Sequence, residues 1–170
     1  DNATVVDGSG AKPMVTDVAV SEGVITRVGH ATRPARRTID AFGRHLTPGF
    51  VDLHGHSDYS LLLDPMARSK VHQGITTEVG GNCGYHAAPV AGAIAAQRRE
   101  EWARSGLTAD WSTTLEYRAR WAEVQPAINY AQQVGYNTLR SVVFVPSIGF
   151  KVGTREGLIM TDEEAKAANP

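Results

Sequence analysis

Short apolar runs separated by turn residues dominate the first 48 residues of the chain. Valines alternate with polar or small residues before a Ser-Glu-Gly sequence at 21–23, and a β-branched run follows it. This pattern predicts a β-hairpin and, over residues 1–48 as a whole, a small all-β module. The strands predicted for this module lie at 4–6, 15–20, 24–28 and 38–40.

After residue 48 the pattern changes, and short apolar strands alternate with longer segments of helical character. Such alternation is typical of a parallel sheet or barrel, so the predicted fold class is α/β. The predicted strands cover 50–53, 75–79 and 128–134, with a further β-branched run at 142–145, and the predicted helices cover 60–72, 90–104, a segment from Thr113 and a segment from Thr161.

Charge and composition exclude several classes of function. The chain has 17 basic and 18 acidic residues, whereas a dedicated nucleic-acid binder needs a surplus of Lys and Arg. It has no apolar run near the roughly 20 residues that span a bilayer, so no membrane partner is expected. The single Cys excludes an internal disulfide and is typical of a reducing compartment, which predicts a cytoplasmic protein.

The strongest chemical signal is a His-Gly-His sequence that directly follows the apolar strand at 50–53. Side chains two residues apart on a strand share a face, so His54 and His56 are predicted to project together from its carboxyl end. Two neutral imidazoles at that edge suit a divalent, zinc-like ion, and Gly55 leaves room on the opposite face. The alternative is a histidine pair in a solvated turn, which the preceding strand disfavours. Asp58 is interpreted as a structural or supporting residue.

A second signal is the Gly-Gly-Asn-Cys-Gly sequence at 80–84, which ends the next apolar strand. A thiol at such a strand end can bind a cation as thiolate, because the cation lowers its pKa. By residue type alone, Cys83 is better interpreted as a small buried apolar residue. Its place one strand after the His pair brings the two alternatives closer together.

Other polar and aromatic residues are interpreted as structural. We expect the remaining histidines at the surface or capping helices, the charged run at 98–101 on a solvated helix face, and the tryptophans in the packing. Arg140 could bind a substrate carboxylate or form a structural ion pair. The residues concerned are His30, His45, His72, His86, Trp102, Trp111 and Trp121.

Four segments together resemble the N-acyl-D-amino-acid deacylase (D-aminoacylase) family of the metal-dependent amidohydrolase superfamily. They are Thr-Val-Val-Asp-Gly-Ser-Gly at 4–10, the segment at 46–58 that contains the His pair, the segment at 73–84 that ends in Asn-Cys-Gly, and Val-Gly-Tyr-Asn-Thr-Leu-Arg at 134–140. The last segment departs from the family pattern, which has His where this chain has Tyr136.

This resemblance implies a TIM-like (β/α)8 barrel preceded by a small β-sandwich domain. Residues 1–48 would be part of the sandwich, and residues 49–170 the first part of a truncated barrel. It also implies one or two Zn²⁺ ions, with His54, His56 and Cys83 as ligands. The expected reaction is hydrolysis of small N-acyl-D-amino acids by a metal-activated water.

A complete barrel of this kind takes about 250 residues, so we expect the chain to be an N-terminal portion of the enzyme. The general base would then lie beyond Pro170, and the isolated chain would be inactive and unstable. One alternative keeps the scaffold but makes the protein a cyclic-amide hydrolase, similar to dihydroorotases or hydantoinases. Another is a non-catalytic fragment that binds metal weakly.

Overall fold

The computed structural model describes residues 1–148, which fall into two compact units. Unit 1 comprises Asp1–Gly49, and unit 2 begins at Phe50. Over the described residues, no helix combines the length and the apolar character that a membrane span requires. The helix predicted from Thr161 lies outside the described residues.

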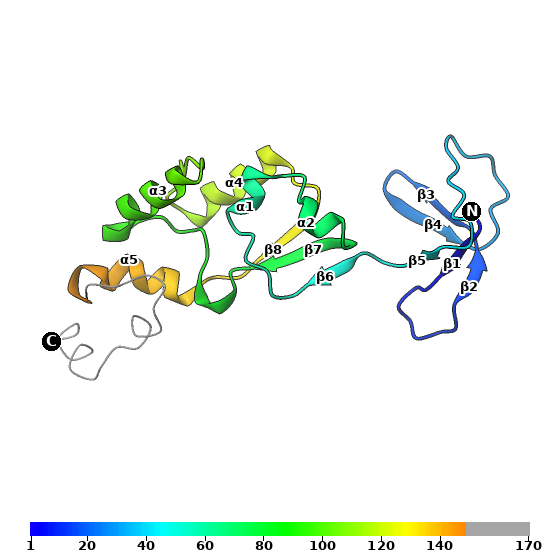
Figure 1. Ribbon diagram of the computed structural model, residues 1–170, viewed down its shortest axis with the longest axis horizontal. Helices are drawn as coiled ribbons and strands as arrows, with labels where there is room; N and C mark the ends of the chain where they lie inside the picture. Colours follow the sequence, from blue (N-terminus) through cyan, green and yellow to red (C-terminus); the bar gives the residue numbers. More distant parts are fainter. Residues whose placement is uncertain (149–170) are drawn as a thin grey trace. The chain divides into compact units, whose positions relative to one another are not determined.

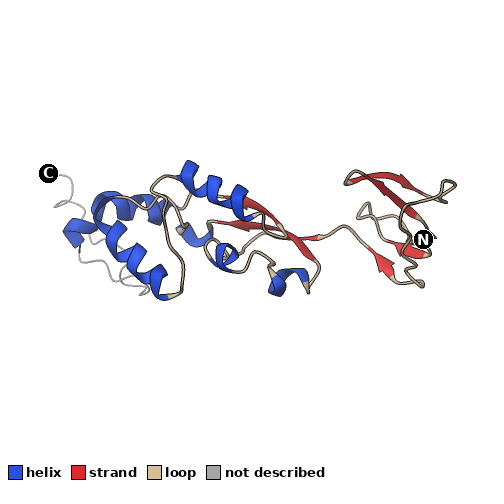
Figure 2. Ribbon diagram, turned by 90° about the horizontal axis from the view of Figure 1, so that it is seen from above, coloured by secondary structure: helices blue, strands red, loops and turns tan. Residues whose placement is uncertain are grey.

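Unit 1 is built from strands and loops (Figure 2). The predicted hairpin is confirmed for residues 18–28, with Glu22 and Gly23 both at positive φ in its two-residue turn. Its first strand, predicted at 15–20, is two strands, because residues 15 and 16 pair with the strand at 3–5 in another sheet. The predicted strand at 38–40 is wrong, because the Asp40 side chain accepts a hydrogen bond from the N–H of Phe42 and turns the chain. The strands are β1 (Ala3–Val5), β2 (Met14–Thr16), β3 (Val18–Ser21), β4 (Val24–Val28) and β5 (His45–Leu46), in sheets β2-β1-β5 and β3-β4.

Unit 2 contains a three-stranded parallel sheet in the order β6-β7-β8 (Figure 1). The strands are β6 (Phe50–Asp52), β7 (Ile75–Gly80) and β8 (Asn129–Gln132). Since all three run the same way, their carboxyl ends share one edge, and the loops that follow them gather there. The α/β expectation is confirmed for this unit.

Helices and short 3₁₀ turns connect these strands. Helices α1, α2 and α4 lie along one side of the sheet (Figure 1). The elements are α1 (Ser60–Leu63), α2 (Arg68–Val71), η1 (Asn82–Gly84), η2 (Gly92–Ile94), α3 (Ala95–Arg104), α4 (Thr114–Val124) and α5 (Tyr136–Ile148). The single helix predicted at 60–72 is therefore two, because Pro65 and the left-handed Ala67 interrupt it. The run at 142–145 is helical, within α5.

An aromatic core lies between the loop at 85–91, α3 and α4. Trp111 and Tyr117 are almost fully buried, and Trp102 and Trp121 pack against them, so the expected packing role of the tryptophans is confirmed. The predicted solvated face at 98–101 is wrong for its arginines. Arg98 and Arg99 are half-buried, and Arg99 donates hydrogen bonds to the carbonyls of residues 109 and 111.

Candidate metal centre

The His54–His56 turn begins where β6 ends, at Asp52. The Asp52 carboxylate accepts a hydrogen bond from the N–H of His54 at 3.1 Å and another from Lys70. The Lys70 bond, followed by the His54 bond, holds the pKa of Asp52 below its usual value, which keeps this acceptor ionised. Both imidazoles thus lie just after the strand, in a turn whose first N–H group is bound by the Asp52 carboxylate.

Glu78 supports the same turn from β7. Its side chain is fully buried, and Oε1 accepts a hydrogen bond from the N–H of Ser57 at 2.9 Å, while Oε2 forms an ion pair with Lys70. A Cβ added at Gly55 would lie 2.0 Å from Oε1, so only glycine leaves room for this carboxylate. The space expected opposite the imidazoles is therefore used by Glu78.

The Cys83 turn follows β7 and is bonded directly to the His turn. Gly81 donates its N–H to Asp58 Oδ1 at 2.8 Å, and the Asn82 side chain donates to the carbonyl of Gly55 at 3.0 Å. The N–H of Gly55 in turn donates to the carbonyl of Val79. These hydrogen bonds join the two turns into one surface at the carboxyl edge of the sheet.

His54, His56 and Cys83 converge on this surface. Cys83 Sγ lies 3.2 Å from His54 Nε2 and 3.6 Å from His56 Nε2, and one ligand atom from each residue lies within 4.8 Å of the others. All three are exposed, and Cys83 is free.

Donor atoms around a tetrahedral Zn²⁺ with bonds of 2.0–2.3 Å are separated by about 3.5 Å, so these spacings fit that ion. Two neutral imidazoles and one thiolate form a donor set that zinc accepts in proteins, and three protein ligands leave a position for water or substrate.

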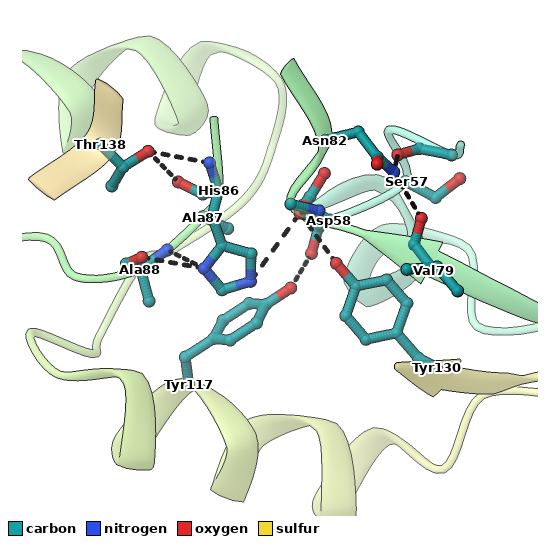
Figure 3. A network of polar contacts seen from close by, with 12 residues as sticks. Ser57, Asp58, Val79, Asn82, His86, Ala87, Ala88, Tyr117, Tyr130 and Thr138 are labelled. Atoms are coloured by element: carbon teal, nitrogen blue, oxygen red, sulfur yellow. Dashed lines mark hydrogen bonds and ion pairs between the residues drawn. The ribbon is translucent and has the colours of Figure 1, made fainter. Parts of the chain in front are cut away.

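Beneath the surface lies a buried polar network around Asp58 (Figure 3). Tyr130 donates its hydroxyl to Asp58 Oδ1 at 2.8 Å, Tyr117 donates to the Asp58 carbonyl, and His86 Nε2 lies 3.8 Å from Oδ1. The expected surface or capping role of His86 is wrong, because this residue is only 4% exposed. Burial lowers the pKa of His86, which favours the neutral imidazole.

The remaining candidates are dispersed. His30, His45 and His72 are exposed, in agreement with their predicted surface positions. Arg140 is half-buried within α5. The sequence interpretation overlooked Lys70 and Glu78, although an ionisable residue within an apolar strand such as β7 is an unusual feature that could have indicated a buried role.

Comparison with known proteins defines the class. A model described as the amidohydrolase family matches residues 37–167, so the chain belongs to the amidohydrolase family. The fold of unit 2, with its donor cluster at the carboxyl edge of a parallel sheet, agrees with that assignment.

Within the family, the chain is similar to N-acyl-D-amino-acid deacylases, as expected from its motifs. It is 40% identical over 147 residues to N-acyl-D-aspartate deacylase of Alcaligenes xylosoxydans xylosoxydans. The matched stretch covers 83% of this chain and 28% of the relative. It also matches the crystal structure of N-acyl-D-glutamate deacylase from Bordetella bronchiseptica, complexed with zinc and a phosphonate inhibitor. That match has a TM-score of 0.71 and 33% identity, and covers 98% of this chain and 33% of that one.

The chain thus spans about a third of the length of these relatives. A D-hydantoinase is also similar, but over a shorter stretch. D-hydantoinase of Ralstonia pickettii is 44% identical over 55 residues, which is 32% of this chain and 12% of the relative.

Proposed function

We propose that the protein containing this chain hydrolyses the amide bond of N-acyl-D-amino acids, with zinc bound by His54, His56 and Cys83. The observation that carries the proposal is the convergence of these three donor atoms within 4.8 Å at the carboxyl edge of the parallel sheet. Similarity to two deacylases of N-acyl-D-amino acids over 83% and 98% of the chain supports the substrate class.

When bound, such a metal acidifies a water molecule and polarises the scissile carbonyl. The residues of this chain hold the site in shape: Asp52 and Glu78 fix the His turn through its backbone N–H groups. Two imidazoles and one thiolate contribute a single negative charge, so a bound Zn²⁺ keeps net positive charge for a polarised oxygen. The proposal covers one or two ions, since the ligand set is open.

In this proposal, the carboxylate that moves the proton from water to the leaving amine lies beyond residue 170. Asp58 is an unsuitable general base, because it is only 6% exposed and its Oδ1 already accepts from Gly81 and Tyr130.

The proposal also includes a (β/α)8 barrel that begins with residues 49–170, supported by the sequential parallel order β6-β7-β8. Residues 1–48 would belong to a β-sandwich domain. The single cysteine, which is typical of a reducing compartment, supports a cytoplasmic location.

The test is hydrolysis of N-acetyl-D-amino acids by the full-length protein before and after treatment with a chelator. We expect activity to be lost on chelation and restored by Zn²⁺. His54→Ala and Cys83→Ala should each weaken zinc binding by more than about 10-fold, since loss of a ligand costs more than loss of a partner that orients one. His72→Ala, at an exposed histidine of the same unit, should leave zinc binding unchanged. Activity that survives removal of all metal would contradict the mechanism.

The D-hydantoinase similarity favours a cyclic-amide hydrolase as second candidate. A panel of N-acyl-D-amino acids, N-acyl-L-amino acids and cyclic amides separates the two, since the proposal expects turnover only of the first group. Zinc binding by the three ligands without turnover of any substrate would favour the third candidate, a non-catalytic metal-binding protein.

A further inference from the structure

Cys83 adopts a backbone conformation that a residue with a side chain rarely takes. Its φ is 54° and its ψ 21°, in the left-handed region. The neighbouring Gly81 and Gly84 also have positive φ, at 80° and 78°. Glycine takes this conformation freely, but a cysteine must be held in it by its surroundings.

The start of α5 supplies a contact that holds this peptide. Asn137 Nδ2 donates a hydrogen bond to the carbonyl of Cys83 at 3.2 Å. The two segments are also packed closely: a Cβ at Gly84 would lie 2.7 Å from the side-chain Nδ2 of Asn137, and a Cβ at Gly135 would lie 2.6 Å from the carbonyl oxygen of Gly84. The turn after β8 therefore packs directly against the turn after β7.

The next residue fixes the other end of the same segment. Thr138 is fully buried, and its Oγ1 accepts from the N–H of His86 at 2.8 Å and donates to the carbonyl of His86 at 3.1 Å (Figure 3). Asn137 and Thr138 thus bind the backbone at both ends of residues 83–86. Asn137 is the one of the two that contacts the residue bearing the thiol.

We propose that Asn137 is a positioning residue for Cys83: its amide fixes the left-handed Cys83 peptide, so that Sγ stays beside the two imidazoles. The inference rests on the proposed function, in which Cys83 is a metal ligand. A free Cys83 peptide would relax toward negative φ and turn Sγ away from His54 and His56, which lie 3.2 and 3.6 Å from it. Partners that orient metal ligands commonly change metal affinity 10–100-fold.

The experiment uses the full-length protein with Asn137→Ala. Zinc affinity is measured by competition with a chelator, and the thiolate-to-cobalt charge-transfer band of the Co²⁺-loaded protein reports the Cys83 bond. We expect about 10-fold weaker zinc binding and a weaker band. The matched control is Asn129→Ala, which removes a side-chain bond of the same 3.2 Å length, to the carbonyl of Thr76, at the other end of β8. It should leave both readings unchanged.

Asn137→Asp is the second variant, because it keeps the shape against Gly84 but places a carboxylate oxygen at the Cys83 carbonyl. It should weaken the cobalt band as well. The inference is overturned if both Asn137 variants keep the band and zinc affinity of the unmodified protein, or if Asn129→Ala weakens zinc equally. Cys83→Ser distinguishes failure of the proposed ligand set from failure of the positioning role. If this variant keeps the cobalt band and the zinc affinity, the proposed ligand set fails. If it removes them while the Asn137 variants do not, only the positioning role fails.

Discussion

The two turns that carry the candidate ligands are held in different ways. The His turn is held by two carboxylates from strands of the sheet. Asp52, at the end of β6, accepts the N–H of His54, and Glu78, on the neighbouring strand β7, accepts the N–H of Ser57. The Cys turn contains no such acceptor of its own. Its own Asn82 side chain donates to the carbonyls of Gly55 and Val79. The other side chains that hold it come from other segments, with Asp58 at Gly81 and Asn137 at Cys83.

This difference affects what each turn tolerates. The His turn depends on a fully buried, ion-paired carboxylate under a glycine, so it should be sensitive to added volume. The Cys turn depends on single hydrogen bonds made across the edge of the sheet, so it should be sensitive to the loss of one partner. Substitutions in each turn can separate these two modes of support.

Gly55→Ala should have the largest effect. The added Cβ would lie 2.0 Å from Glu78 Oε1, so the turn or the buried carboxylate must move. Overpacking of this kind costs about 3 kcal/mol of unfolding free energy, and the displaced imidazoles should also lose zinc affinity. The shift of the urea midpoint of the full-length protein measures the first effect, and chelator competition the second.

The same substitution in a Glu78→Ala background provides the control. If the clash with the carboxylate is the cause, Gly55→Ala should cost much less there, and the double variant should be clearly less than additive. Additive losses would show that Gly55 is required for another reason, and the His turn would not depend on Glu78 in the way described.

Asp58→Ala comes next, because Asp58 is the link between the two turns. The change leaves the N–H of Gly81 and the hydroxyl of Tyr130 without this acceptor. We expect a loss of about 2 kcal/mol of unfolding free energy, the usual cost of a buried polar group without a partner.

Asp64→Ala is the comparison for Asp58, since it removes a largely exposed i,i+4 pair with Arg68 and should cost about 0.5 kcal/mol. Urea unfolding of both variants checks the ranking. Equal losses of unfolding free energy in the two variants would mean that the Asp58 bonds stabilise the protein no more than an exposed ion pair does.

The same contrast explains what could be predicted from the sequence. The hairpin, the parallel strands and the edge that carries His54 and His56 follow from local patterns, because strand ends and turn residues are encoded within a few positions. Supports that come from far along the chain have no local signature. Asn137 and Thr138 act on residues 54 and 52 positions away, and nothing near His86 showed that it would be buried. The β-branched run at 142–145 favoured a strand, but it is part of helix α5, because so short an apolar run fits either structure and the longer helix decides.

The smallest expected effect is a pH dependence of the unfolding free energy that arises from the buried His86. Burial lowers its pKa from the ordinary 6.5, and the Arg98 guanidinium acts in the same direction. The hydrogen bond with the Ala88 backbone and the Asp58 carboxylate both raise this pKa without cancelling the shift, and the neutral Tyr117 ring packs against the imidazole. The folded protein therefore binds a proton less readily than the unfolded chain.

Its stability should accordingly be complete above pH 6.5 and fall as the pH drops below that value, by about 1.4 kcal/mol for each pH unit between the two pKa values. Urea unfolding of the metal-free protein at pH 7.5, 6.5 and 5.5 measures this slope, with His86→Asn as the reference, because Asn keeps a polar atom near Ala88 but does not titrate. The unmodified protein should lose more stability than the variant on acidification. Parallel pH profiles would place the charge change of His86 outside this range, and the Asp58 network would then support the turns through hydrogen bonds alone.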